Sequence, residues 1–124
     1  MGMNKYLNKK TEIDGILFDS KKEALYYRKL KCSQDAGKIR DLQMQVSYEL
    51  IPAVYRDETV HLKTKDKIVR KQIQRPIIYK ADFVYIDCST GNTEVVDVKG
   101  IRTKEYILKK KMMLALKGIE IQEI

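Results

Sequence analysis

Charged residues placed inside apolar runs constrain this chain more than any other feature of its sequence. Positions 79–111 read YKADFVYIDCSTGNTEVVDVKGIRTKEYILKKK, which predicts a strand, a tight turn, a second strand and a helix. Asp82 stands at the head of the first strand-like run, and Asp97 and Lys99 interrupt the second. A charge in such a run costs free energy unless it is paired or bound to a metal ion. These three residues are therefore the first candidates for a functional site.

Strand geometry decides whether the three side chains meet. Residues two apart on a strand project from one face, roughly 6 to 7 Å apart, so Asp97 and Lys99 share a face. Residues 88–92 have the composition of a turn, which predicts an antiparallel hairpin. If Asp82 lies opposite Asp97 or Lys99, all three side chains share that face, whereas a slip of one residue turns Asp82 away. The sequence leaves this register open.

The bulk composition narrows the class of protein. A chain of 124 residues with 44% hydrophobic content can bury one core, so we expect a single domain over residues 1–124. The sequence has neither a long apolar run nor a signal-peptide pattern, which predicts a soluble, cytoplasmic protein without a membrane partner. Two cysteines and one histidine exclude a disulfide framework and a histidine-based metal cluster. The net charge of +8 favours a polyanionic partner.

The chain before residue 52 is predicted to contain an arm, a turn, a helix and a strand. Residues 1–12 are polar and basic, which predicts a flexible arm. The Asp-Gly pair at 14–15 predicts a turn or short hairpin. A capping-box sequence at 20–23 predicts a helix to about Asp35, ended by a glycine at 37. Strict alternation over residues 42–50 predicts a strand that ends at a proline. The expected buried side of the helix is Ala24, Tyr27 and Leu30, with Leu25 or Tyr26 beside it.

The pattern weakens over residues 53–74, where two interpretations stay open. One is an exposed basic hairpin that turns at residues 64–67, and the other is a short helix. Basic residues are frequent between Lys63 and Arg75, which suits contact with phosphates. Further on, we predict a helix capped by Thr103 and a final strand over residues 119–124. The helix is expected to end at about Lys117, before Gly118, and to bury Ile107, Leu108, Met112 and Ala115.

Two carboxylates and a lysine on one face suit the hydrolysis of a phosphodiester. We expect Asp82 and Asp97 to bind Mg²⁺, with Mn²⁺ able to replace it, because Mg²⁺ prefers one or two carboxylates together with water and phosphate oxygens. Such an ion polarises the phosphate and lowers the pKa of a bound water. Lys99 would orient that water or stabilise the developing negative charge. Glu23, on the first predicted helix, would complete the metal shell directly or through water. No small-molecule cofactor is expected.

The order of these parts resembles the PD-(D/E)XK nuclease superfamily, in which a helix glutamate precedes an aspartate and a hairpin return carrying acid-x-Lys. Here the parts are Glu23, Asp82 and Asp97-Val98-Lys99. The chain is most similar to a small phage-borne family in that superfamily, over nearly its whole length. The shared sequences are FDSKKEA at 18–24, a strand with Gln43 and Gln45, YKADFVY at 79–85, VVDVKG at 95–100, and a lysine-rich helix after Thr103. Ala81 in place of proline and an aspartate at position 97 in place of glutamate depart from the superfamily pattern.

The resemblance implies a restriction-endonuclease-like α/β fold, with a central mixed β-sheet flanked by helices. It implies a Mg²⁺-dependent DNA endonuclease, selective for junctions or other branched DNA, that acts in phage recombination or DNA processing in the host cytoplasm. Members of the superfamily include Holliday-junction resolvases, phage endonucleases and restriction enzymes, and they often work as homodimers. Two alternatives stay open: a DNA- or RNA-binding module of the same fold without catalysis, and an interaction protein whose basic surface meets an acidic partner.

Each candidate residue also has a structural interpretation. The Asp97–Lys99 pair fits an exposed strand edge, Asp82 fits a strand start, and Glu23 fits the capping box alone. By resemblance, Gln45 points into the cleft rather than to solvent. The expected DNA-binding residues are Gln45, Thr103, Lys109, Lys111, Arg70 and Lys71. For the two helix lysines the alternative is a solvated helix face, and for Thr103 it is helix capping.

Overall fold

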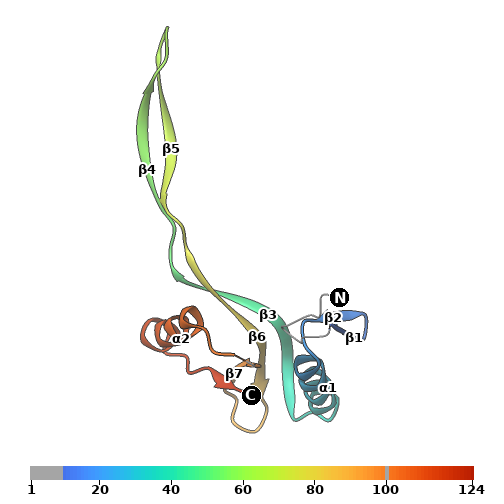
Figure 1. Ribbon diagram of the computed structural model, residues 1–124. Helices are drawn as coiled ribbons and strands as arrows, with labels where there is room; N and C mark the ends of the chain where they lie inside the picture. Colours follow the sequence, from blue (N-terminus) through green and yellow to red (C-terminus); the bar gives the residue numbers. More distant parts are fainter. Residues whose placement is uncertain (1–9, 100) are drawn as a thin grey trace. The chain divides into compact units, whose positions relative to one another are not determined.

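The computed structural model describes residues 10–99 and 101–124, and it shows a mixed α/β protein (Figure 1). The predicted α/β class is confirmed; its assignment to the restriction-endonuclease-like type stays a prediction. Within the described residues three sheets form, with strand orders β1-β2, β3-β6-β7-β8 and β4-β5. The elements are β1 (Thr11–Ile13), β2 (Ile16–Phe18), α1 (Lys21–Asp35), β3 (Ile39–Ile51), β4 (Val54–His61), β5 (Asp66–Gln74), β6 (Ile77–Asp87), β7 (Thr93–Asp97), α2 (Lys104–Lys117) and β8 (Gln122–Glu123).

The contacts within the chain divide it into two compact units. The first unit comprises the chain up to Val46 together with Ala81–Arg102 and Ile121–Ile124. The second comprises Ser47–Lys80 and Thr103–Glu120. That the two act as one domain stays a prediction.

The predicted antiparallel hairpin between β6 and β7 is confirmed, and its register is now defined. Phe83 lies opposite Val96, and Val84 lies opposite Val95. One step further along this register places Asp82 across from Asp97, so the two acids lie on a common face. β8 pairs with β7 in parallel, which makes the four-stranded sheet mixed and places β7 between two neighbours.

Helix α1 supplies one side of the core of the first unit, as predicted. Ser20 is its N-cap, and the side-chain oxygen of Ser20 accepts a hydrogen bond from the Glu23 N–H at 3.1 Å. Tyr26, rather than Leu25, lies beside the buried side: its ring centre is 5.7 Å from that of Phe83, whereas Leu25 is 51% exposed. The buried members of this core are Phe18, Ala24, Tyr27, Leu30, Ile39, Phe83 and Val96.

Helix α2, in the second unit, has the predicted bounds but not the predicted buried side. Thr103 caps it, and Gly118 ends it in the left-handed conformation, with φ of +67°. Its buried residues are Tyr106 and Met113, whereas Ile107 and Leu108 are exposed. The predicted stripe was wrong because the buried side follows Tyr106, whose ring packs against that of Tyr79 at 6.4 Å. Of the other predicted members, Met112 is half-buried and Ala115 is exposed.

The segment after Pro52 forms the predicted hairpin, and the alternative of a short helix is wrong. β4 and β5 pair antiparallel from Val54–Gln74 to His61–Asp66. The turn lies at residues 62–65 rather than 64–67, because the N–H of Leu62 donates to the carbonyl of Lys65 at 2.9 Å. Asp66 and Lys67 are therefore the first two residues of β5 and not part of the turn.

The ends of the chain differ from the predictions in two places. The final strand spans only Gln122–Glu123, because the Ile119 N–H still donates to Met113 and completes the end of α2. The predicted arm covered residues 1–12, of which residues 1–9 lie outside the described residues, whereas Thr11 and Glu12 belong to β1. Gly100, expected to end a strand, is also outside the described residues. Neither helix in the described part of the chain is long and apolar enough to cross a membrane.

Candidate active site

The middle of β6 and the end of β7 bring together the three residues that interrupt the apolar runs. The Val98 N–H donates a 2.8 Å hydrogen bond to Asp82 Oδ2, which fixes that carboxylate against the second strand. Lys99 Nζ lies 2.9 Å from Asp97 Oδ1. Asp97 is only 2% exposed and β7 is flanked on both sides, so the alternative of an exposed edge is wrong for it.

Gln45 of β3 joins the glutamate of α1 to this group. Its amide Nε2 donates to Glu23 Oε1 at 3.2 Å and to Asp82 Oδ1 at 3.4 Å. Two carboxylate oxygens from different elements therefore converge on one amide nitrogen. We define the carboxylate cluster as Glu23, Gln45, Asp82, Asp97 and Lys99, all of which belong to the first unit.

The two roles considered for Glu23 are separated in the structure. Its backbone N–H serves the helix cap, through Ser20. Its carboxylate is engaged with Gln45, and the residue is only 8% exposed. Capping therefore accounts for the N–H of Glu23 and not for the position of its side chain.

The backbone at Gln45 is in an unusual conformation for a strand. Its φ is +54°, in the left-handed region that residues other than glycine rarely adopt. Such a conformation costs on the order of 1 to 3 kcal/mol and is often found at functional sites. The strain is located at the residue whose amide holds two acids together.

Two carboxylates of the cluster, those of Glu23 and Asp82, have raised pKa values. Burial first, and then the charges of Asp82, Asp19 and Asp97, raise the pKa of Glu23 to about 7 against the opposing effect of Lys99. Burial also raises the pKa of Asp82 to about 6, opposed first by the Val98 N–H. The ionised form of each of these two acids is thus poorly solvated.

The cluster can be tested for its fit to a metal ion. As the side chains stand, the described residues contain no group of three or more His, Cys, Asp or Glu residues arranged to hold one. Mg²⁺ itself needs only one or two carboxylates, with water and substrate oxygens for the rest. Asp82, held near Glu23 by a shared amide and with a raised pKa, has the oxygen donors and the uncompensated charge that suit such an ion. The donor set therefore fits Mg²⁺ through Asp82 and Asp97, with Glu23 in support.

Two neighbours of the cluster were not found from the sequence. Lys22 Nζ donates to the backbone carbonyl of Lys99 at 3.1 Å, which brings a second ammonium group beside the cluster. Asp19 lines a pocket with Glu23 and Gln45, whose apolar walls include Phe18 and Met44. The only sequence signal for either residue was its place next to the helix cap.

The other predicted DNA-binding residues belong to the second unit. Thr103 Oγ1 accepts from the Tyr106 N–H, so its observed role is capping. Lys109 lies 2.8 Å from Glu105 one helical turn away, and Lys111 is exposed. Arg70 and Lys71 are neighbours on β5, and so they project from opposite faces of the hairpin.

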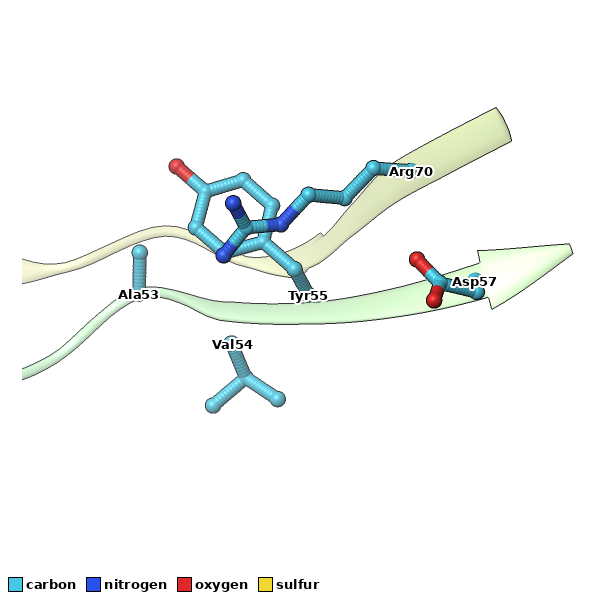
Figure 2. Close-up of a pocket in the computed structure, with 5 residues that line it drawn as sticks. All are labelled: Ala53, Val54, Tyr55, Asp57 and Arg70. Carbon is cyan, nitrogen blue, oxygen red and sulfur yellow. The ribbon is translucent and has the colours of Figure 1, made fainter. Parts of the chain in front are cut away.

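Figure 2 shows Arg70 from β5 lying over the ring of Tyr55 from β4, with Asp57 further along β4. The guanidinium carbon is 4.1 Å from the ring centre, within range of a cation–π interaction. Lys71, on the other face, lies 3.8 Å from Glu58. The two cations are therefore held by different partners.

Comparison with known proteins places the chain in a family. A family model described as "Protein of unknown function (DUF1064)" matches residues 3–122, and the chain belongs to this family. No curated protein and no solved structure matches the chain.

Proposed function

We propose that this protein is a Mg²⁺-dependent endonuclease that hydrolyses phosphodiester bonds in DNA. The observation that carries the proposal is the convergence of Glu23 and Asp82 on the Gln45 amide, next to the ion pair of the buried Asp97 with Lys99. Such a cluster is costly for stability, because it removes carboxylates from water and places like charges together. Clusters that reduce stability in this way are typical of functional sites.

Each residue of the carboxylate cluster has its own role in this proposal. Asp82 and Asp97, with Glu23, would hold Mg²⁺, which when bound polarises a phosphate and activates water. Lys99, held at 2.9 Å by Asp97, donates hydrogen bonds to the attacking water or to the phosphate oxygens as negative charge develops. Gln45 positions Glu23 and Asp82 relative to each other.

DNA is the proposed substrate because the net charge of +8 favours a polyanion. Selectivity for junctions or other branched DNA, a role in phage recombination and a location in the host cytoplasm follow from the resemblance to PD-(D/E)XK nucleases. Assembly as a homodimer is proposed on the same ground. Exposed apolar side chains on α2 support self-association, and they are Ile107, Leu108, Leu114 and Leu116.

A second candidate is a DNA- or RNA-binding module without catalysis. One observation favours it: the basic residues of the β4–β5 hairpin are exposed, and their contacts with phosphates need no metal ion. This candidate predicts the same affinity for DNA with and without Mg²⁺. It also predicts that Asp97→Asn changes binding only through its charge.

The experiment that separates the two candidates is cleavage of labelled four-way junction, flap, single-stranded and duplex DNA in Mg²⁺ or Mn²⁺. Wild type should cut at least one substrate, and Asp97→Asn and Lys99→Ala should lower the rate roughly 10²- to 10⁴-fold. Lys80→Ala, at an exposed lysine of β6, is the matched control and should cut normally. Absence of cleavage by folded wild type with either ion, alongside salt-sensitive binding, would overturn the nuclease proposal.

A further inference from the structure

The β4–β5 hairpin has two faces that differ in charge. Cross-strand partners project from the same face, and successive residues alternate between faces. We define the basic face by the pairs Arg56–Lys71, Glu58–Val69 and Val60–Lys67, which carry a net charge of +2. We define the mixed face by the pairs Tyr55–Gln72, Asp57–Arg70, Thr59–Ile68 and His61–Asp66, which carry a net charge of −1 with the histidine neutral.

The polar groups of the mixed face bind one another. Arg70 lies over the Tyr55 ring (Figure 2). The hydroxyl of Tyr55 accepts a hydrogen bond from Gln72 Nε2 at 3.3 Å. Nearer the turn, His61 Nδ1 and Asp66 Oδ1 are 2.7 Å apart. Many of the polar side chains of the mixed face therefore have partners on the same face.

The basic face and the turn leave positive charge facing the solvent. Arg56 lies 2.9 Å from Glu58, the one acid of that face. Lys67 and the two lysines of the turn, Lys63 and Lys65, form no ion pair within the described part of the chain. The basic side chains therefore form a row along one side of the hairpin.

The hairpin is exposed on both faces along almost its entire length. Only Glu58 and Val69 are half-buried among the residues of its two strands. A lone pair of strands is marginally stable in water, and its open edges can pair with other chains. A two-stranded ribbon of this kind is stabilised when a partner covers one face.

We propose that the basic face of the β4–β5 hairpin enters the major groove of duplex DNA. The major groove of B-form DNA is about 12 Å wide and admits a two-stranded β-ribbon. Arg56, Lys67 and Lys71 then contact phosphates, and the apolar side chains between them face the groove. The major groove of A-form RNA is too deep and narrow for this contact. The inference shares the substrate class of the proposed function, and it does not require catalysis.

The test compares two double variants with the same change of charge on opposite faces. Lys67→Gln with Lys71→Gln removes two charges from the basic face. Thr59→Glu with Gln72→Glu adds two negative charges to the mixed face. All four positions are exposed, and circular dichroism verifies that both variants fold. Binding to a labelled duplex is measured by fluorescence anisotropy in EDTA over a range of salt concentrations, so that no cleavage intervenes.

The basic-face variant should bind duplex DNA roughly 10- to 100-fold more weakly and lose about two units from the slope of log affinity against log salt. The mixed-face variant should stay within about threefold of wild type and keep its slope. Equal losses in the two variants, no loss in either, or equal wild-type affinity for duplex RNA would overturn the inference. Because binding is read without metal, failure of this inference and failure of the nuclease proposal are distinguishable.

Discussion

The carboxylate cluster and the β4–β5 hairpin use charge in opposite ways. In the cluster, Asp97 is 2% exposed and its partner Lys99 has a side chain that is 25% exposed. In the hairpin, the side chains of Arg56 and Lys71 are each 61% exposed. Charges of the first region interact with one another at low exposure, whereas those of the second keep most of their hydration.

This difference sets what each region can do. Burial raises the pKa of Glu23 and Asp82 and strengthens every electrostatic interaction among them, which suits chemistry on a bound phosphate. Exposure keeps ionic contacts weak and screened, which suits reversible binding to a polyanion. The cluster should therefore affect stability strongly, and the hairpin weakly.

Removing one cation from each region should give the largest difference in the free energy of unfolding between the two regions. Lys99→Met takes the ammonium group from the buried Asp97 and should lower the free energy of unfolding by roughly 2 kcal/mol, because Lys99 is itself partly exposed. Arg56→Met, at an exposed ion pair with Glu58, should cost less than about 0.5 kcal/mol. Urea denaturation followed by circular dichroism measures both. Equal losses would contradict the contrast between the regions, and Asp97→Asn combined with Lys99→Met should recover part of the loss.

The raised pKa values predict the second effect, a fall in stability of the metal-free protein with rising pH. A carboxylate whose pKa is higher in the folded than in the unfolded protein stabilises the fold when the pH is below its unfolded-state pKa. That contribution is lost as the pH rises through the folded-state pKa. For Glu23 the window runs from 4.5 to about 7, and for Asp82 from 3.8 to about 6. Glu23→Gln should melt higher than wild type at pH 8 by on the order of 5 °C, and the difference should shrink toward pH 4.

The control for this pH dependence is Glu58→Gln in the exposed hairpin, which should give the same difference from wild type at both pH values. Thermal melts in EDTA measure all three proteins. Mg²⁺ should raise the melting temperature of wild type at pH 8 more than that of Glu23→Gln, since the ion offsets the same repulsion. A difference between wild type and Glu23→Gln that does not change with pH would contradict the raised pKa.

Local signals in the sequence predicted the elements well. Ser20 and Thr103 cap their helices, Gly118 ends one, and the turn at 88–92 joins two antiparallel strands, because each of these depends on a few neighbouring residues. The succession of helices and strands followed from the same patterns. The buried side of α2 did not, because it depends on the packing of Tyr106 against Tyr79, far away in the sequence.

The candidate site was predicted in its members but not in its geometry. Charges inside apolar runs indicated Asp82, Asp97 and Lys99, since such charges need a partner. The register that aligns the two acids comes from the whole hairpin and could not be read from alternation alone. The amide bridge of Gln45 depends on a left-handed backbone conformation inside a strand, for which the regular alternation of residues 42–50 gave no sign.

That backbone conformation gives the third and smallest stability effect. Gln45→Ala and Gln45→Gly both remove the amide from the cluster, so the difference between them isolates the strain at φ of +54°. Glycine adopts this conformation freely, and Gln45→Gly should be more stable than Gln45→Ala by about 1 kcal/mol. Urea denaturation measures the difference.

Gln43, two residues earlier on β3, is the matched control, because its φ is not positive. There the order should reverse, with Gln43→Gly less stable than Gln43→Ala by about 0.5 to 1 kcal/mol, since glycine weakens a regular strand. The same order at both positions would show that Gln45 is not strained. Opposite orders would show that β3 is strained at Gln45, the residue that bridges Glu23 and Asp82. The backbone of β3 would then depart from regular strand geometry at the residue that the site requires.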